Sequence, residues 1–370
     1  MKKLAIDCRM INASGIGSVI KGLLPYFVNS SEFKCYLLGN TDEINKFLSD
    51  KVNGDLPIIM ELKSKIYSIK EQFELILKIP KCDIFWSPHY NVPILPIRAK
   101  KRISMVCDVN HFAFFNRLNI KQKVYAKTII NLCTRIASVI ITISEFSKNE
   151  IVKYTGTNPN KIKVFYLSGD KKFKIIEDKS ELQKTRDLYK LPYKYLLYVG
   201  NVKPHKNIVN LIKAFRIVNE KHDDFKLVIV GKKEGFITGI DNIAGLIKSE
   251  NLEDKVVFTG FVPDNDLVNI YNLANIFVFP SLYEGFGIPP IEAMAAGVPV
   301  VASNVSSIPE VCGEAANYVD PYSIDDIAKG INRVIEDKNL QQELIKKGFE
   351  RIKVFSWEKA YSEIVDIFRK

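Results

Sequence analysis

The sequence predicts an α/β protein of two domains, each built around a parallel β-sheet. Short apolar runs of strand length alternate with amphipathic runs of helix length along the 370 residues, and this alternation is typical of parallel sheets covered by helices. A chain of this length exceeds one ordinary hydrophobic core, so two domains are expected. A charged stretch with little apolar periodicity, residues 169–194, predicts a linker between them.

The first predicted domain covers residues 1–168. Its expected strands are short apolar runs that end at turn or polar residues, namely Leu4–Cys8, Lys34–Leu38, Asp83–Trp86, Ile103–Cys107 and Val139–Ile143. Helical periodicity lies between them, as in Val19–Val28 and Lys123–Arg135.

The second predicted domain covers residues 195–356 and shows the clearer pattern. Its expected strands are Tyr195–Gly200, Lys226–Gly231, Val256–Gly260, Ile276–Pro280 and Pro299–Ser303, which read as strands buried on both faces. Amphipathic helices are expected over Asn207–Asn219 and Ile324–Ile335. Ser356 is a suitable N-cap for a last helix over residues 357–370.

Composition favours a globular chain that works in the cytoplasm. Apolar residues make up 47% of the sequence, and no apolar run reaches the roughly 18 residues of a membrane-spanning helix. The six cysteines lack paired spacing, which favours a reducing compartment. The four histidines lack the spacing of a zinc site, so no structural metal is expected.

The net charge of +11 is concentrated in the first half of the chain. Residues 1–169 hold 25 Lys and Arg against 13 Asp and Glu, and the remainder holds 28 against 29. An anionic membrane surface would suit this asymmetry, with the protein peripheral on the inner face of the plasma membrane. A lysine-rich surface that serves only solubility explains it about as well. No nucleic-acid-binding motif is present, so nucleic acid is not an expected partner.

The most informative segment is Ile276–Ser303, in which a strand, a glycine-containing loop and a helix that opens with Pro289 and Pro290 follow one another. Proline is suited to the first helical turn, where an N–H group would lack an intrahelical partner. The N-terminus of a helix beside a glycine loop is a favourable place for a diphosphate. The expected contacts are the backbone N–H groups of Gly285, Phe286, Gly287 and Ile288.

Two glutamates flank this predicted diphosphate site. Glu292 falls in the first turn of the helix, where its carboxylate could accept hydrogen bonds from two ribose hydroxyls. Glu284 follows the strand and could bind the hydroxyls of a sugar beyond the phosphates. The alternative is a purely structural role, with Glu284 an exposed turn acid and Glu292 a first-turn acid that stabilises the helix dipole; it explains Glu292 tolerably but Glu284 poorly.

These residues resemble a known family. The glutamates form an E-x7-E pair inside the block E-G-F-G-I-P-P-I-E-A-M-A-A-G-V-P-V-V-A-S, which is similar to the family-four retaining glycosyltransferases, especially those that build bacterial surface polysaccharides such as lipopolysaccharide. The resemblance implies the GT-B fold, two Rossmann-like domains facing each other across a cleft. It also implies that the last helix returns to the first domain.

A second block, Tyr198–Asn207, again follows a strand and opens a helix. In the family, basic residues of this turn hold the donor diphosphate, and Lys206 matches the family lysine. Many relatives carry Arg directly after the glycine, where this chain has Asn201, so Lys203 is a candidate for the second positive charge. The resemblance implies that Asn201, Lys203 and Lys206 all belong to the donor site.

The first half offers weaker candidates. Gly15 and Gly17 precede a helix, and the family's G-x-G loop faces the donor phosphates and acceptor; a plain tight turn is the alternative. His89 ends a strand and is the candidate for the sugar or acceptor pocket. Asp108 matches the aspartate of a family His-Asp pair, whereas Cys107 replaces the histidine. His111 could substitute for it, although a surface-loop histidine is the commoner case.

The resemblance implies transfer of a hexose, with retained anomeric configuration, from a nucleoside-diphosphate sugar to a hydroxyl of a glycan or lipid-linked acceptor. It implies no cofactor and no catalytic metal, because Lys206 and the loop amides would stabilise the leaving diphosphate. Asp264 and Asp266 are interpreted as helix-start residues and not as a metal-binding D-x-D motif. The alternatives are a sugar-nucleotide-binding protein without turnover, a sugar-nucleotide epimerase and a storage-glucan synthase of the same fold.

Overall fold

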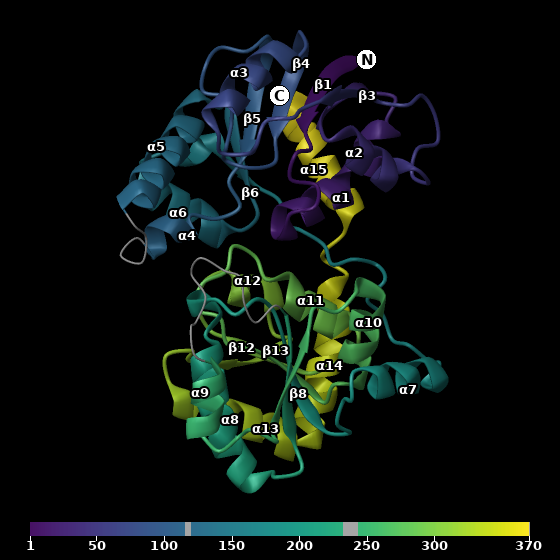
Figure 1. The fold of residues 1–370 in the computed structure, drawn as a ribbon, viewed down its shortest axis with the longest axis vertical. Helices are drawn as coiled ribbons and strands as arrows, with labels where there is room; N and C mark the ends of the chain where they lie inside the picture. The colour runs from purple at the N-terminus through teal and green to yellow at the C-terminus, as the bar shows by residue number, and fades with distance from the viewer. Residues whose placement is uncertain (115–119, 232–242, 370) are drawn as a thin grey trace. The chain divides into compact units, whose positions relative to one another are not determined.

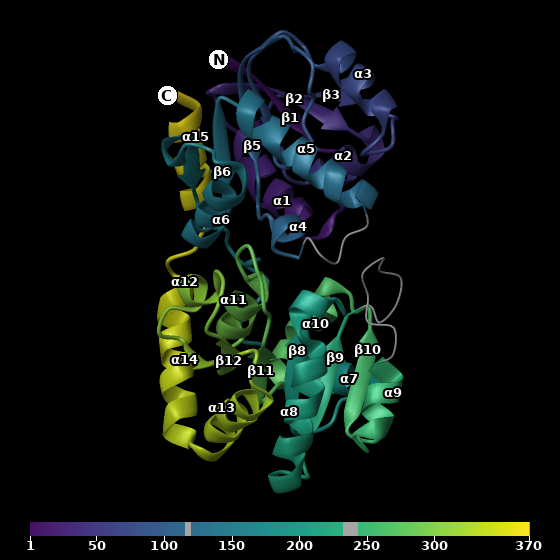
Figure 2. The same cartoon turned by 90° about the vertical axis from the view of Figure 1, so that its left-hand side faces the viewer.

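A computed structural model describes residues 1–114, 120–231 and 243–369. These residues form two compact units (Figures 1 and 2). Unit 1 comprises Met1–Leu167 and Ser356–Lys370, and unit 2 comprises Ser168–Phe355. Over the described residues, no helix is both long and apolar enough to cross a lipid bilayer.

Unit 1 is built on a seven-stranded parallel sheet with the order β3-β2-β1-β4-β5-β6-β7. Its strands are β1 Lys2–Asp7, β2 Phe33–Gly39, β3 Ile58–Glu61, β4 Cys82–Ser87, β5 Ala99–Met105, β6 Val139–Thr142 and β7 Ile162–Val164. Its helices are α1 Ser14–Val28, α2 Thr41–Leu48, α3 Ile69–Lys78, α4 Asn110–Ala113, α5 Ile120–Ile136, α6 Glu145–Thr155 and α15 Trp357–Arg369, with a short 3₁₀ turn at Pro159–Lys161.

The last helix, α15, completes unit 1 by packing on α1. Phe368 stacks on Phe27 at a ring-centroid distance of 5.6 Å and meets the buried Trp86 edge-on at 5.9 Å. A Cβ atom at Gly22 would lie 2.3 Å from the Trp357 ring, so only glycine allows the two helices to approach this closely. Aromatic side chains from both ends of the sequence therefore share one core, and Figure 1 shows α15 lying beside α1.

Unit 2 is built on a six-stranded parallel sheet with the order β10-β9-β8-β11-β12-β13. Its strands are β8 Tyr195–Val199, β9 Lys226–Val230, β10 Val256–Gly260, β11 Ile276–Phe279, β12 Val300–Ser303 and β13 Ala316–Val319. Its helices are α7 Lys179–Leu188, α8 Ile208–Lys221, α9 Ile243–Ser249, α10 Asp264–Leu273, α11 Ile288–Ala295, α12 Ile308–Cys312, α13 Ile324–Glu336 and α14 Lys338–Ile352, with a 3₁₀ turn at Pro204–Lys206.

Alternate side chains of β8 point to opposite faces of this sheet, as the two-residue period of a strand requires. Leu196 and Tyr198 join the core under α8 and α13, whereas Tyr195 and Leu197 join the core under α10 and α11. All four side chains are fully buried. This burial on both faces explains why the strands of unit 2 are continuous apolar runs in the sequence.

The stretch 169–194, expected as a linker, belongs to unit 2 and contains α7. The Asp178 carboxylate caps the helix by accepting from the backbone N–H groups of Ser180 and Glu181. Asn269 on α10 then donates to the Thr185 hydroxyl of α7 at 3.0 Å. Phe173 and Leu191, on either side of α7, are buried in the core of unit 2, but the cap of α7 and these contacts with α10 are polar, so the segment shows little apolar periodicity in the sequence.

Candidate active site

The candidate site lies where the strand order of unit 2 reverses, between β8 and β11. In open α/β sheets, ligands bind beyond the carboxyl ends of the strands at such a reversal. The chain leaves β8 toward the 3₁₀ turn Pro204–Lys206, and it leaves β11 toward the loop that precedes α11. The backbone N–H of Leu282 donates to the His205 carbonyl at 2.7 Å, which ties the two segments together.

Lys206, expected to stabilise the leaving diphosphate, and Glu284, expected to bind the sugar, contact each other at this point. The Lys206 ammonium lies 2.7 Å from Oε1 and 2.8 Å from Oε2 of Glu284. The two side chains are 20% and 12% exposed. The pair is therefore partly desolvated, which strengthens its electrostatic attraction, and it remains accessible to a ligand.

Asn207 positions Lys206, and the sequence reasoning gave this residue no role. Its φ of 61° lies in the left-handed region, which asparagine tolerates better than most residues. Its side-chain amide donates to the Pro280 carbonyl at 3.0 Å and to the Pro321 carbonyl at 2.7 Å. Asn207 thereby joins the start of α8 to the segment after β11. The only sequence signal was its place directly after Lys206.

Two serines after β12 support the Glu284 loop. The Ser307 hydroxyl lies within hydrogen-bonding distance of the Glu284 carbonyl, 2.9 Å, and of the Phe286 carbonyl, 2.7 Å. The backbone N–H of Glu284 donates to the Ser306 hydroxyl. The spacing of Ser307 and Glu310 suggests a capping box, but Ser307 makes no side-chain cap at α12, and its backbone is helical instead of the extended conformation typical of an N-cap.

Gly287 stands immediately before α11 with a φ of 113°, a conformation that L side chains rarely adopt. It turns the chain from the Gly285–Phe286 segment into the first turn of α11, which starts at Ile288 and contains Pro289 and Pro290. The structure thus places the predicted glycine loop, the two prolines and the helix N-terminus next to one another, as a diphosphate site requires.

Glu292 lies in the next turn of α11 and is half-buried. Burial raises the pKa of its carboxyl from 4.5 to about 7, although the neighbouring Tyr271 hydroxyl and Lys172 ammonium oppose the shift. The Tyr271 hydroxyl donates to Glu292 Oε2 at 3.0 Å, and Tyr271 itself is fully buried on α10. Tyr271 orients the carboxylate, and nothing in the sequence pattern of α10 distinguished it from a core aromatic.

The remaining donor-site candidates lie in the segment after β8. The Asn201 carbonyl accepts from the backbone N–H of Lys203 at 3.0 Å, and the half-buried Lys203 precedes the 3₁₀ turn. A Cβ atom at Gly231 would lie 2.1 Å from the Gly200 carbonyl oxygen. Glycine at position 231 therefore allows the ends of β8 and β9 to approach closely.

In unit 1 the strand order reverses between β1 and β4, and a buried ionic network fills that position. Arg9 binds Asp7 through Nε at 2.9 Å and Nη2 at 2.6 Å, and its Nη1 lies 3.1 Å from Glu71 Oε2. Burial by itself would raise the pKa of Asp7, but Arg9 and His89 beside it hold that pKa far below its ordinary value. The sequence reasoning missed this network, since its members come from three separate segments.

His89, expected in the sugar or acceptor pocket, is part of this network. Its Nε2 lies 3.0 Å from Asp7 Oδ2, and its Nδ1 accepts from the backbone N–H of Asn91 at 3.1 Å. The side chain is 1% exposed. Both ring nitrogens are already engaged by the protein, so in this structure His89 occupies an internal position and not a sugar-binding surface.

The other candidates of unit 1 are local features. Gly15 and Gly17 lie within the first turn of α1 and not in a loop before it. A Cβ atom at Gly17 would lie 2.5 Å from the Ile11 carbonyl oxygen, so packing already requires glycine there. The Asp108 carboxylate accepts from the backbone N–H of Asn110 at 2.9 Å, an interaction that starts α4. His111 lies on α4, with its ring 5.8 Å from that of Tyr90.

The aspartates of the D-x-D-like sequence are bound by other side chains. Asp264 lies 2.7 Å from the Lys172 ammonium, and Asp266 accepts from the Tyr189 hydroxyl at 2.7 Å. Within residues 1–114, 120–231 and 243–369, no group of three or more His, Cys, Asp or Glu side chains is arranged to hold a metal ion.

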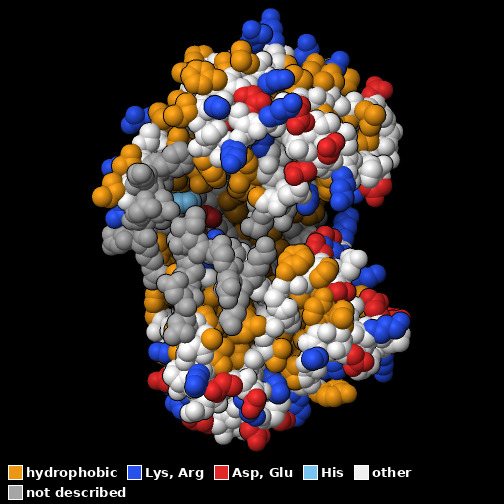
Figure 3. Space-filling view, in the orientation of Figure 1, with side chains coloured by type: hydrophobic (Ala, Val, Ile, Leu, Met, Phe, Trp, Pro, Cys, Tyr) orange, Lys and Arg blue, Asp and Glu red, His pale blue; other side chains and the backbone are white. Residues whose placement is uncertain are grey.

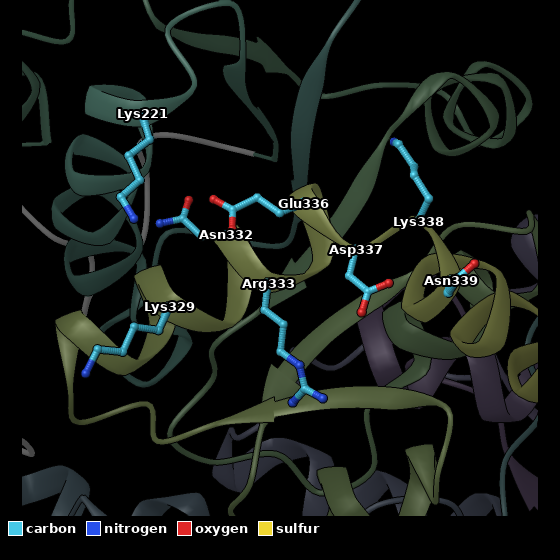
Figure 4. Close-up of a pocket in the computed structure, with 8 residues that line it drawn as sticks. All are labelled: Lys221, Lys329, Asn332, Arg333, Glu336, Asp337, Lys338 and Asn339. Atoms are coloured by element: carbon cyan, nitrogen blue, oxygen red, sulfur yellow. The ribbon is translucent and has the colours of Figure 1, made fainter.

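A shallow hollow elsewhere on unit 2 is lined by charged residues at the ends of α8 and α13 and the start of α14 (Figure 4). Lys221 and Asn332 point toward one another across it (Figure 4). Helices that follow parallel strands end at the amino-terminal edge of the sheet, so this hollow lies at the opposite edge from Lys206 and Glu284. It takes no part in the candidate site.

Solved structures place the two units in a known fold class. HepE of Anabaena, solved with UDP-glucose, matches the whole chain over its own whole length with a TM-score of 0.81 at 17% identity. WaaG, described as a glycosyltransferase involved in lipopolysaccharide biosynthesis, matches 99% of both chains with a TM-score of 0.73 at 14% identity. The fold is GT-B, as the sequence predicts.

Sequence comparison then gives the family. The model of the family described as glycosyl transferases group 1 matches residues 180–351. The O-antigen chain mannosyltransferase B of Escherichia coli is 30% identical over 289 residues, which are 77% of this chain and 74% of that protein. The serotype-specific mannosyltransferase WbdA of Escherichia coli is 31% identical over 237 residues, and the match spans 29% of its length. The chain belongs to the glycosyl transferases group 1 family.

Proposed function

We propose that the protein transfers a hexose from a nucleoside-diphosphate sugar to a hydroxyl of a glycan or lipid-linked acceptor, with retention of the anomeric configuration and without a metal ion. The observation that carries this proposal is the contact between Lys206 and Glu284 beside the start of α11. It combines a cation for a diphosphate with a carboxylate for sugar hydroxyls at the reversal of strand order.

The leaving diphosphate gains negative charge as its bond to the sugar breaks. Lys206, with Lys203 as the second cation, would stabilise that charge together with the backbone N–H groups at residues 285–288. Glu292 would accept hydrogen bonds from the ribose hydroxyls, and Glu284 would bind the transferred sugar. The leaving phosphate oxygen would take the acceptor proton on the face from which it departs, so no protein base is required.

The relatives support a proposal for the sugar and the acceptor. Two of them are described as O-antigen chain mannosyltransferases, and one from Staphylococcus aureus, CapM, as a capsular polysaccharide biosynthesis glycosyltransferase. We therefore infer a mannosyl donor and a cell-surface polysaccharide acceptor. Thermal-shift measurements with UDP, GDP and dTDP would identify the nucleobase, since a ligand that binds only the folded state raises its stability.

Transfer in the presence of excess EDTA tests the mechanism. The assay uses an oligosaccharide acceptor and the mannosyl donor that carries the nucleobase identified by thermal shift. The protein should retain its turnover, and the product linkage should have the anomeric configuration of the donor. Loss of turnover with EDTA and its return with magnesium or manganese would refute the metal-free mechanism. Binding of donor without turnover on any acceptor would favour a binding protein instead.

A further inference from the structure

Helix α3 of unit 1 has an apolar face that no described residue covers. Ile69, Phe73 and Leu77 recur at four-residue spacing, so they lie on one side of the helix. They are 81%, 59% and 82% exposed. The opposite side is also apolar, since Leu75 and Ile79 are buried against the sheet. A surface helix normally has apolar residues only on its buried side, so the exposed apolar stripe indicates an interaction surface.

Lysines surround this stripe. Lys63 and Lys65 precede α3, Lys70 and Lys78 lie within it, and all four are exposed. The backbone N–H of Cys82, four residues after α3, donates to the Arg98 carbonyl at 3.0 Å. That contact brings the basic segment 98–102 next to the end of the helix. In Figure 3, hydrophobic and basic side chains are interspersed over the part of unit 1 that holds α3.

The acidic residues of the same segment are occupied within the fold. Glu71 is 1% exposed and binds Arg9. Glu74 accepts from the backbone N–H groups of Lys63 and Ser64, at 2.9 and 2.8 Å. Glu61 accepts from the backbone N–H of Thr41 at 2.7 Å. Between residues 56 and 81 there are no other acids, and these three glutamates stand against five lysines, so the net charge of this segment is positive.

We infer that the α3 face, defined as Ile69, Phe73 and Leu77 with Lys63, Lys65, Lys70 and Lys78, docks on an anionic lipid surface. An apolar stripe bordered by lysines matches a membrane interface, where apolar side chains enter the acyl boundary and lysines meet the anionic headgroups. A second copy of the chain fits poorly, because a two-fold contact would set this lysine-rich face against itself. The inference does not depend on the proposed reaction.

Sedimentation of the full-length protein with vesicles tests this inference. The wild type should sediment with vesicles of phosphatidylcholine and phosphatidylglycerol, but not with phosphatidylcholine alone. It should be released as salt rises from about 0.1 M to about 1 M, where the Debye length falls to about 3 Å. The double variant Phe73→Ser Leu77→Ser should weaken partition by at least about tenfold, and each change of Lys70 or Lys78 to Ser by about fivefold.

The matched control is Leu188→Ser Tyr193→Ser, which removes two equally exposed apolar side chains from unit 2, 68% and 77% exposed. Its partition should equal that of the wild type. The unfolding midpoint of each variant shows whether the fold is kept. Equal recovery of the wild type with neutral and anionic vesicles would overturn the inference, as would unchanged partition of the stripe variant. Self-association abolished by that variant, without vesicle binding, would assign the face to a protein contact.

Discussion

Replacing Glu292 by Gln should stabilise the protein at neutral and alkaline pH while weakening nucleotide binding. Burial raises the pKa of Glu292 to about 7 in the folded protein, against 4.5 for an ordinary glutamate. Above pH 7 the folded protein therefore holds a carboxylate in a position that favours the neutral form. Glutamine is neutral at every pH, has nearly the same shape, and keeps an oxygen that can accept from Tyr271.

The magnitude follows from linkage between protonation and folding. Below about pH 4.5 both the folded and the unfolded protein carry a protonated Glu292, so its ionisation costs nothing. Between about pH 4.5 and pH 7 the unfolded chain ionises first, and stability falls as pH rises. Above pH 7 the cost is complete, at most about 3–4 kcal/mol, since the pKa rises from 4.5 to about 7 and each unit of pKa corresponds to about 1.4 kcal/mol.

Thermal unfolding at several pH values measures this difference. At pH 8, Glu292→Gln should raise the melting temperature of the transition that contains unit 2 by several degrees, given about 2–4 °C per kcal/mol for a unit of this size. At pH 4.5 the two proteins should melt together. Glu253→Gln, a change at an exposed acid of unit 2 shortly before β10, is the matched control and should show no such pH dependence.

Titration with the nucleoside diphosphate completes the test. Glu292→Gln should lose roughly 1.5–3 kcal/mol of binding free energy, the usual worth of hydrogen bonds to a charged group. A stability gain paired with an affinity loss marks a side chain kept for function. Equal stability differences at pH 4.5 and pH 8 would refute the burial argument, and unchanged affinity would refute the ribose contact.

Three further substitutions test the two strand-order reversals. Lys206→Ala should lower turnover by about 10²–10³-fold with little change in the free energy of unfolding. Turnover within threefold of the wild type would remove Lys206 from the mechanism. Lys213→Ala, on α8, is the control. Glu284→Gln should leave binding of the bare nucleoside diphosphate equal or stronger, because Lys206 loses its ion-pair partner, while transfer falls; loss of diphosphate binding would contradict the assigned division of roles. Arg9→Met should lower the free energy of unfolding, measured with denaturant, by about 3–5 kcal/mol, because Asp7 and Glu71 stay buried without their cation. The triple variant Arg9→Met Asp7→Asn Glu71→Gln should recover part of that loss. An equal loss in the triple variant would show that charge pairing is not the cause.

The architecture was predictable because burial on both faces of a parallel strand leaves a continuous apolar run. The runs at Tyr195–Gly200 and Ile276–Pro280 predicted β8 and β11 to within a residue at each end. The edge strands β3, β7 and β13 escaped prediction, because these short runs contain the polar residues Glu61, Lys163 and Asn317 and are not continuously apolar. Helix α7 escaped for another reason: its caps and contacts with α10 are polar.

The loops of the candidate site were predictable in chemistry but not in geometry. A glycine loop before a proline-led helix indicates a diphosphate site wherever it follows a strand. The contact of Lys206 with Glu284 joins residues 78 positions apart, and only the order of strands brings them together. Tyr271 and Asn207 act through contacts of the same long-range kind, so no local pattern identified them.

The two strand-order reversals occupy equivalent topological positions but differ in how their charges are satisfied. In unit 1, the side chains of Asp7, Arg9 and His89 bind one another and are almost fully buried. A ligand would therefore gain little free energy by replacing those bonds. In unit 2, the Lys206 ammonium binds Glu284 and lies 5.7 Å from the centroid of the Phe279 ring, the ion pair is partly exposed, and burial raises the pKa of Glu292. Charges that the fold leaves incompletely satisfied are those that a bound ligand can stabilise. This difference supports assigning the donor to unit 2 and a structural role to the network of unit 1.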